Sequence, residues 1–463
     1  MHQSSIKRGM AICESRKVFR RYYIDLLIMV FIVIFFTLLL PLLRSPLPQL
    51  PFSSDKIASI EGVLLSDATP LKGKRFLYKI KINSATSITN ITASSKGAVK
   101  VIARGDYLYR GSLVRVINPR FDPDYNYLNK LFYNPLPMVN SREVILLKES
   151  KQSYYRNKVA KPIFEAIEKI DAGDGLVSAL LTGNRIDLDP VLTKNIRKAG
   201  CAHILALSGM HLGVVTMFVL FLFKKIAGGK KAIIAAFVFN FLFALFAGMS
   251  VPLLRAFIFF SIINFAKITG RAVDIGKLFV LSFVITVLLA PDEAGDLSFH
   301  YSFLAMAGII FFCPYFFRIF LGFTPPLLAS QFAFTIAAQL PSLVLSSIVF
   351  GELYSSGIIA SIIVSFLVTI FMLTAFPGVI IILFTDIPVV PVSFLIKMLS
   401  SLIHHCAVFF AGFPVFKPNS IAIFILIIIN LFVILLTMFP YLPGNYFKKY
   451  EKYKILNFLK RFK

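Results

Sequence analysis

The sequence of 463 residues contains no tryptophan, four cysteines and only 23 acidic residues. Without tryptophan, the aromatic belts that anchor a membrane protein at the lipid–water interface would have to consist of tyrosine and phenylalanine. The cysteines form no CxxC pair and no cluster with histidine, so the sequence suggests neither a disulfide framework nor a zinc site. They are Cys13, Cys201, Cys313 and Cys406. The chain also lacks a GxxxxGK(S/T) loop, so any directed transport would take its energy from a partner or a gradient.

Long apolar runs are what the chain has in abundance. Hydrophobic residues make up 57% of it, 49 residues are phenylalanine, and the mean hydropathy is +0.77. Many of the runs approach the ~20 residues that cross a bilayer. The sequence therefore predicts an α-helical polytopic membrane protein with about ten spans, in the cytoplasmic (inner) membrane. The expected spans are 24–43, 201–223, 232–248, 252–268, 277–291, 299–317, 327–349, 357–384, 389–412 and 419–440.

The distribution of positive charge predicts the topology. Residues 1–23 and 441–463 are both basic, so both termini are expected in the cytoplasm. The lysines at 224, 225, 230 and 231 are then inside, and the short acidic segments PDEAGDLS and GELYSSG are outside. The run 24–43 is long for a cleavable signal peptide and lacks a small-residue cleavage site, so we expect it to remain as the first span.

Residues 51–150 follow a different pattern. Short β-rich runs such as KRFLYKIKIN and SLVRVINP are separated by Gly, Asn and Pro, which predicts a small extracytoplasmic β domain, such as a partly open barrel. After it, charges at helical spacing in 153–198 predict an amphipathic helical connector, either on the membrane surface or solvated. From Arg44 to Ile170 there are 21 Lys and Arg against 10 Asp and Glu, a net charge of +11. Topology does not explain this excess outside the cell, whereas a polyanion or an anionic membrane surface would.

The segment CAHILALSGMHLGVV, residues 201–215, places polar groups where an apolar run begins. If the whole segment is one helix, His203, Ser208 and His211 lie within an arc of about 140°. Gly209 and Gly213 form a GxxxG pattern, which permits close approach of two helices. One interpretation is therefore a packing face with incidental polarity. We favour the other, that the polar groups face a cavity or an aqueous path, because ionisable groups inside membranes are usually functional.

Further polar residues interrupt the later apolar runs. Pro252 lies between two apolar runs, and Arg255 follows it. One interpretation is a broken helix in which Arg255 is a cation suited to an anionic ligand. The other is that the Arg255 side chain snorkels to the membrane interface. His300 at a helix start and Gln339 before a proline are candidates of the same kind, although each could equally be a cap or a hydrogen bond between helices. His404 and His405 lie in the middle of a predicted span.

Taken together, these segments resemble the ComEC family of competence DNA-uptake channels. The matching residues are LLTGNRIDLDPVLTKNIRKAGCAHILALSGMHLGVV, GMSVPLLRAFIFF, GRAVD, PDEAGDLSFHYSFLAMAGI and QLPSLVLSSIVFG, in the order of the family's membrane domain. The resemblance implies that 201–440 forms the channel domain, with candidate residues His203, Ser208, Gly209, His211, Gly213, Pro252, Arg255, His300 and Gln339. Upstream, INPRFDPDYNYLNKLFYNPLPM resembles the end of the family's OB-like domain.

The resemblance implies a function as well. Members of the family carry single-stranded DNA across the cytoplasmic membrane during natural transformation, and OB-type folds bind single strands with basic grooves and aromatic platforms. Single-stranded DNA and the lipid bilayer are thus the expected partners. A DNA receptor, a cytoplasmic helicase or translocase and a separate nuclease are further candidate partners. No cofactor is expected. The candidate DNA-binding residues of the β domain are Lys74, Arg75, Lys79, Lys81, Lys100, Arg104, Arg110 and Arg115. Phe76, Tyr78, Tyr107 and Tyr109 are candidate stacking residues, although a place in the core or in a cross-strand pair is the commoner role for any one of them.

The sequence also departs from the family. Many members end in a metallo-β-lactamase-like domain, whereas this sequence has no HxHxDH metal motif, so we expect no nuclease activity and no enzyme. A family-typical Asn near SGIIASIIVSF is replaced by serines. Two other functions stay open: an intramembrane serine protease, because ALSG approaches a GxSG motif and His404 or His405 could supply a base, and a transporter of another anionic substrate.

Overall fold

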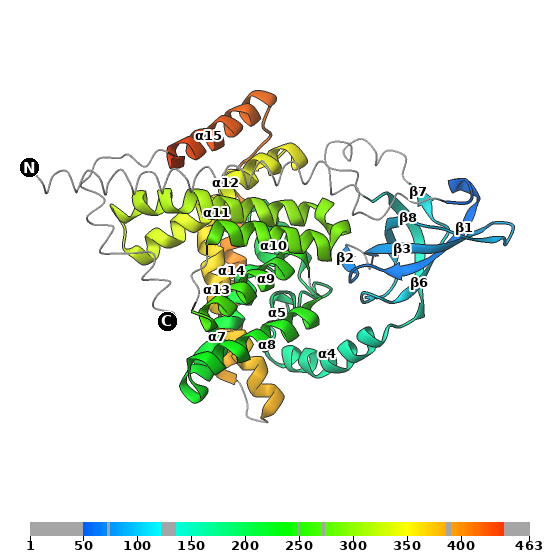
Figure 1. Cartoon of the computed structure of the whole chain (residues 1–463), viewed down its shortest axis with the longest axis horizontal. Helices are drawn as coiled ribbons and strands as arrows, with labels where there is room; N and C mark the ends of the chain where they lie inside the picture. Colours follow the sequence, from blue (N-terminus) through cyan, green and yellow to red (C-terminus); the bar gives the residue numbers. More distant parts are fainter. Residues whose placement is uncertain are drawn as a thin grey trace, which may run out of the picture. The chain divides into compact units, whose positions relative to one another are not determined.

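The computed structural model describes residues 50–71, 75–121, 136–248, 250–270, 274–385 and 390–438. The expected basic N-terminus 1–23, first span 24–43 and basic tail 441–463 lie outside these residues. The described chain forms two compact units, one of residues 50–300 and 363–412 and the other of residues 301–362 and 413–438. The strands, blue to cyan in Figure 1, gather in one region of the first unit.

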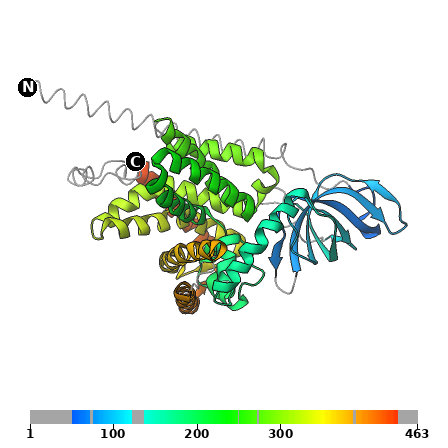
Figure 2. The same cartoon turned by 90° about the horizontal axis from the view of Figure 1, so that it is seen from below.

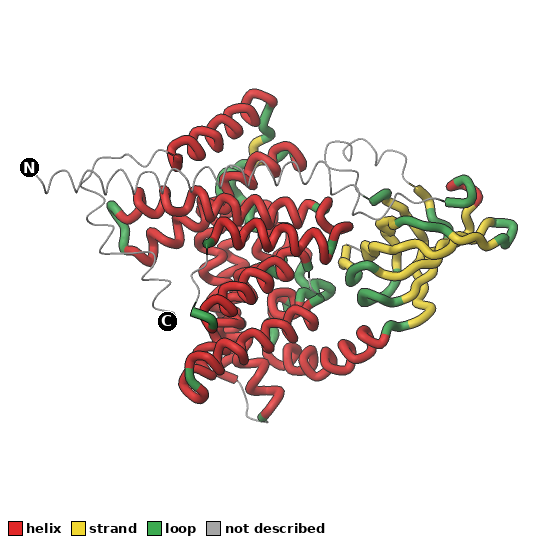
Figure 3. The backbone as a smooth tube through the Cα atoms, in the orientation of Figure 1, coloured by secondary structure: helices red, strands yellow, loops and turns green. Residues whose placement is uncertain are grey.

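The strands form a closed barrel. Its five main strands are β1 (Ile57–Leu64), β3 (Arg75–Ser87), β5 (Ala98–Arg104), β6 (Leu113–Ile117) and β8 (Met138–Lys148). They pair in the order β1-β6-β8-β5-β3, and β3 pairs again with β1, which closes the ring. The β5–β8 pair is parallel, and the other four pairs are antiparallel. This is the five-stranded arrangement of an OB-like barrel. The short strands β2 (Thr69–Leu71) and β4 (Thr92–Ser94) pair with β3, and β7 (Arg120–Phe121) pairs with β8. Figure 2 shows the barrel strands turned by 90°, and Figure 3 shows them in yellow.

The alternation of residues in β3 explains why this segment is a strand. Tyr78 and Ile80 are fully buried, whereas Arg75 and Lys81 are exposed, as the two-residue period of a strand requires. The inward residues of all five strands join one apolar core. Tyr78 is the largest side chain in that core, and its hydroxyl donates to the Asp106 carbonyl at 2.9 Å. The outward residues of β3 include the charged side chains that do not enter this core.

The rest of the first unit is helical. The expected connector 153–198 contains the helices α4, α5 and α6, which are followed by a short 3-10 turn, η3, and then by apolar helices that pack in sequence order. The bounds are α4 (Lys151–Ile170), α5 (Leu176–Thr182), α6 (Pro190–Lys198), η3 (Ala202–Leu205), α7 (Gly209–Ala227), α8 (Gly229–Ala247), α9 (Val251–Ile268), α10 (Ile275–Leu289), η4 (Pro291–Gly295) and α14 (Val390–Ala411). Most of α13 (Gly357–Phe384) also belongs to this unit.

The second unit consists of helix pairs and one small strand pair. It holds most of α11 (Leu297–Leu321), together with α12 (Pro326–Phe350) and α15 (Ser420–Met438), and β9 (Leu353–Tyr354) pairs with β10 (Val415–Phe416). Helices α11 and α12 approach closely at Gly308, where an added Cβ would lie 2.0 Å from the Ala337 carbonyl oxygen. Glycine is the residue that permits this contact between helix backbones.

Seven of the described helices are long and apolar enough to cross a membrane: α7, α8, α9, α11, α12, α13 and α14. Two shorter apolar helices, α10 and the described part of α15, coincide with the expected spans 277–291 and 419–440. The 15 residues of α10 rise about 22 Å, less than the ~30 Å of a hydrocarbon core. The predicted fold class is confirmed: the protein is a polytopic α-helical membrane protein with a small OB-like β domain. The count of ten spans and the domain limits stay predictions.

Candidate functional site

The outer face of strands β3 and β5 carries pairs of like charge. In the antiparallel register, Arg75 lies opposite Arg104 and Lys79 lies opposite Lys100, with an apolar pair between them. Cationic side chains directly across two strands repel each other, so such pairs destabilise a sheet unless an anion lies between them. We name this surface, with its pairs Arg75–Arg104 and Lys79–Lys100, the basic β3–β5 face.

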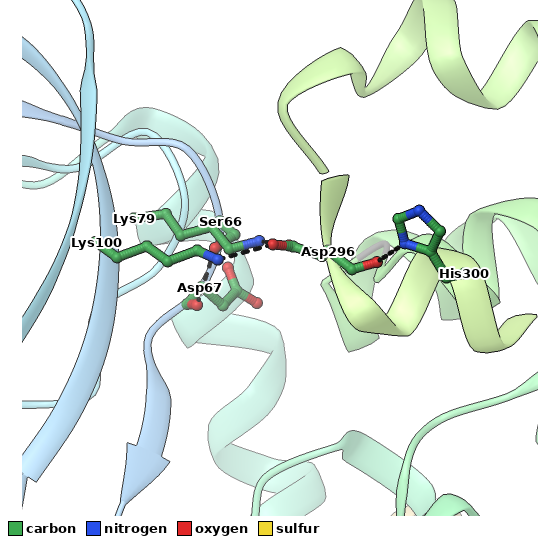
Figure 4. A network of polar contacts seen from close by, with 6 residues as sticks. All are labelled: Ser66, Asp67, Lys79, Lys100, Asp296 and His300. Carbon is green, nitrogen blue, oxygen red and sulfur yellow. Dashed lines mark hydrogen bonds and ion pairs between the residues drawn. The ribbon is translucent and has the colours of Figure 1, made fainter. Parts of the chain in front are cut away.

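One of these pairs already holds an anion from the same chain. The carboxylate of Asp296, at the end of η4, accepts from the ammonium of Lys100 at 2.9 Å and also from that of Lys79 (Figure 4). The three side chains are only 13–15% exposed. Burial by itself would raise the pKa of Asp296, but the two ammonium groups outweigh it and hold this pKa below its usual range. The carboxylate is therefore ionised at neutral pH.

His300 fixes the backbone from which this carboxylate extends. Its Nδ1 lies 2.9 Å from the Asp296 carbonyl oxygen, which can only accept, so Nδ1 carries the proton (Figure 4). The backbone N–H of His300 also donates to this oxygen, at 3.3 Å, and that of Phe299 does so at 3.0 Å. His300 was predicted to be a residue of the channel domain. In the structure, its ring holds the Asp296 backbone through the carbonyl oxygen.

The other candidate DNA-binding residues have different surroundings. Lys74 lies outside the described residues, whereas Arg75, Lys81, Arg104 and Arg110 are exposed. Arg115 lies on β6 and donates to Glu61 through Nε at 2.8 Å, so its charge is partly neutralised. Lys79 and Lys100 contact Asp296, a partner that no pattern in the sequence predicts.

The prediction that aromatic residues stack on bases is wrong for two of the four. Tyr78 is fully buried and Phe76 is 7% exposed, and both belong to the barrel core. They point inward because they alternate with the charged residues of β3. Tyr107 and Tyr109 follow β5 in a partly buried loop, and their rings contact each other edge to face with centroids 5.2 Å apart.

The segment 201–215 is not one helix, so the expected span 201–223 begins late and the predicted arc of three polar residues is wrong. Helix α7 starts only at Gly209 because Ser208 is its N-cap, with the extended backbone angles φ −133° and ψ 178°. The Ser208 hydroxyl accepts from the Met210 N–H at 3.3 Å, and the His211 Nδ1 accepts from the Ser208 N–H at 3.2 Å. This is a capping box with histidine in place of the usual Glu or Gln. His203 lies in η3, away from the helix, and is exposed.

The capping box also fixes the proton on His211. Because Nδ1 accepts a backbone N–H, the neutral ring carries its proton on Nε2, and the Ser208 hydroxyl, 3.0 Å from Nδ1, donates to it. His211 is fully buried, and within the described part of the chain its Nε2 has no hydrogen-bond partner. A buried donor without a partner is costly, which makes Nε2 a candidate contact for a ligand or for water.

A serine hydroxyl that donates to an imidazole is also the arrangement of a serine nucleophile and its base. In such enzymes a third group orients the base, whereas Nε2 of His211 meets no such group in the described ranges. His405, the base suggested for a protease, instead bonds through Nδ1 to the Ser401 carbonyl of its own helix at 2.7 Å. No three His, Cys, Asp or Glu residues that could hold a metal ion come together in the described ranges either.

Helix α9 places a buried cation beside the start of α7. Arg255 is 8% exposed in the second turn of α9, and its neighbour Ala256 would be 3.4 Å from a Cβ at Gly209. Pro252 does not break a helix as the sequence suggested, because it stands in the first turn of α9, where no N–H is needed. At Gly213, by contrast, an added Cβ would meet no atom of the described residues within 4 Å, so the described part of the chain shows no close GxxxG contact there.

A second arginine near this site was absent from the sequence-based candidates. Nη2 of Arg185 donates to the Leu205 carbonyl at 2.7 Å and thereby holds η3 in place, just before the capping box. Burial lowers the pKa of Arg185 from its usual value. Arg185 ends the segment LLTGNR, which opens the stretch that resembles the ComEC family, and that resemblance is the sequence signal that could have found it.

Two aspartates accept backbone N–H groups at the start of α5, and one of them also contacts α14. Asp171 accepts from the Gly175 N–H at 3.0 Å, and burial raises its pKa. Asp174 caps α5 by accepting from the Leu176 N–H at 3.0 Å, and the Ser400 hydroxyl of α14 donates to its other carboxylate oxygen. Gln339 belongs to the second unit and is half-buried.

Fold and site together define a multi-pass membrane protein with an OB-like barrel, a basic β3–β5 face, and buried His and Arg side chains at the start of two adjacent helices. The family model described as Competence protein matches residues 180–440, more than half of the chain. The chain therefore belongs to the Competence protein family.

One known relative is the ComE operon protein 3 of Bacillus subtilis (strain 168). It is 25% identical to this chain over 137 residues, which cover 29% of this chain and 18% of the relative. The matched segment thus spans less than a fifth of that relative's length. No solved structure matches the chain.

Proposed function

We propose that this protein is a membrane channel that imports single-stranded DNA across the cytoplasmic membrane in natural transformation. The observation that carries the proposal is the basic β3–β5 face, with its cross-strand pairs Arg75–Arg104 and Lys79–Lys100. Opposed cations suit a chain of phosphates, which supplies an anion at regular intervals. The family and its relative support a role in competence, and the barrel and its charge support a nucleic acid as the substrate.

The helices of the first unit would form the path for the strand. A phosphate that crosses a bilayer needs donors that replace water, and such donors must be buried in protein. Arg255 and the Nε2–H of His211 meet this requirement, because both belong to buried side chains at the start of adjacent helices. Arg185 would then act indirectly, by holding the turn that precedes the capping box.

The proposal includes an orientation. The barrel contacts Asp296 in the segment PDEAGDLS, so both must lie on one side of the membrane. The charge distribution puts that acidic segment outside and the lysines 224, 225, 230 and 231 inside. An outer barrel would receive the strand before the helices do. A DNA receptor, a cytoplasmic helicase or translocase and a separate nuclease would be its partners.

Binding of a single-stranded oligothymidylate to the full chain in detergent, measured as a function of salt, tests the role of the barrel. We expect the affinity to fall steeply with salt, and the double variant R75A/R104A to reduce the slope of log K against log salt by about 1.4, at about 0.7 per phosphate contact. The matched control is K230A/K231A, which removes the same charge from exposed residues of α8 and should leave the slope unchanged.

Uptake in the cell tests the channel itself. Deletion of the gene in a transformable host should stop labelled DNA from entering the cytoplasm. Unchanged entry would refute the channel function, and binding that is absent or independent of salt would refute the role of the barrel.

A further inference from the structure

The contact of Asp296 with the basic β3–β5 face resembles the binding of a phosphodiester. One carboxylate oxygen accepts from Lys79 and the other from Lys100, so each ammonium holds a different oxygen of one anion (Figure 4). A phosphodiester likewise has a single charge shared by two terminal oxygens. Lys79 and Lys100 thus share the single carboxylate of Asp296.

The same contact closes this part of the face to nucleic acid. The Lys79 and Lys100 side chains are 15% and 13% exposed, so a phosphate can reach their ammonium groups only if the carboxylate leaves. Asp296 is separated from them by 217 and 196 residues in the sequence, and it lies at the junction of η4 and α11. The contact therefore joins the barrel to the start of a membrane-spanning helix.

We propose that Lys79 and Lys100 form a phosphate subsite that Asp296 occupies in the absence of nucleic acid, and that a bound strand displaces Asp296 and frees the η4–α11 junction from the barrel. This inference rests on the proposed function, since it needs a polyanion that binds the barrel. It adds an intramolecular competitor and a link from the barrel to α11. His300 is then a positioning residue, because it holds the Asp296 backbone through the carbonyl oxygen.

The variant D296N tests the competition in the full chain in detergent. Removal of the competing charge should tighten binding of a single-stranded oligothymidylate about tenfold, and the salt slope should become steeper by about 0.7 for each added phosphate contact. D296E keeps the carboxylate and should stay close to wild type. The triple variant K79A/K100A/D296N should lose the gain, because it lacks the subsite.

A second measurement needs no substitution. A zero-length carbodiimide cross-link should join Asp296 to Lys79 or Lys100 in the wild-type chain, as detected by peptide mass spectrometry. Saturating oligothymidylate should lower the yield of this cross-link at least severalfold, whereas thymidine without phosphate should not. A yield that stays constant at saturation overturns the inference even if D296N does not fold.

The outcomes separate this inference from the proposed function. If wild type binds DNA with a slope that depends on Arg75 and Arg104 but D296N binds no more tightly, the competition is refuted and the proposed function stands. If neither wild type nor D296N binds DNA, this inference and the role of the barrel are both refuted, whereas the channel function is decided by the uptake measurement.

Discussion

The capping box at the start of α7 allows a structural role of Ser208 to be separated from a catalytic one. In the variant S208A, the Met210 N–H loses its acceptor at 3.3 Å and the His211 ring loses its hydroxyl partner at 3.0 Å. Loss of a serine N-cap costs about 0.5–2 kcal/mol, and we expect about 1 kcal/mol here because the Ser208 N–H still reaches His211. S208T keeps the hydroxyl and should stay within a few tenths of a kcal/mol of wild type.

Thermal unfolding in detergent, followed by size-exclusion chromatography after stepwise heating, measures this difference. S208A should unfold at a lower temperature than wild type, and S208T should not. A stability of S208A equal to that of wild type would refute the cap as the reason for Ser208. The same samples, treated with a fluorophosphonate, should show no label at Ser208, because no group orients His211 from its Nε2 side in the described residues. Labelling would favour the protease instead.

Three further predictions concern the barrel and the helix contacts. The pKa of Asp296 is lowered, so the contribution of this ion pair to stability is complete above the ordinary aspartate pKa of about 3.9 and is lost as the pH falls through the lower folded value. The difference in unfolding temperature between wild type and D296N should therefore be constant from neutral pH down to about pH 5 and vanish in stronger acid. A difference that stays constant in strong acid would contradict this role of the carboxylate. Y78F removes the hydrogen bond to the Asp106 carbonyl and should lower the free energy of unfolding by about 1 kcal/mol in denaturant titrations. Phenylalanine keeps the ring in the core, so the change reports the hydrogen bond and not the packing. G308A would place a Cβ 2.0 Å from the Ala337 carbonyl oxygen and should destabilise the protein by about 1–3 kcal/mol. G213A would place a Cβ with no atom of the described residues within 4 Å, and it should be neutral or stabilising in the same unfolding assay. Equal effects of the two variants would refute the close contact at Gly308.

The predictable part of this structure is local. The alternation of charged and apolar residues in β3 is a property of neighbours in the sequence, and so is the length of the apolar runs that became α7 to α9 and α11 to α14. The beginning of α7 was predictable in principle, because a serine followed three residues later by a polar side chain is the pattern of a capping box. Histidine in place of Glu or Gln hid it. Pro252 after Ser250 is likewise the pattern of a helix start.

The remaining part depends on tertiary contacts. No local pattern relates Asp296 to Lys79 and Lys100, because the partners are about two hundred residues apart. A glycine pattern does not say which glycine has a neighbour, so GxxxG pointed to Gly213 whereas the close contact is at Gly308. For the same reason, the candidate residues chosen from the sequence included Arg255 but not Arg185, whose partner Leu205 is twenty residues away.

The closure of the barrel limits how any partner can recognise it. Because β1 pairs with β3, the ring of five main strands is closed, and among the described residues the strands outside it are two or three residues long. A partner therefore cannot add a strand by backbone hydrogen bonds, as peptides do on open sheets. Recognition has to use side chains, and side chains that hold phosphates do not distinguish one base from another. Under the proposed function, a barrel of this kind would accept a strand of any sequence.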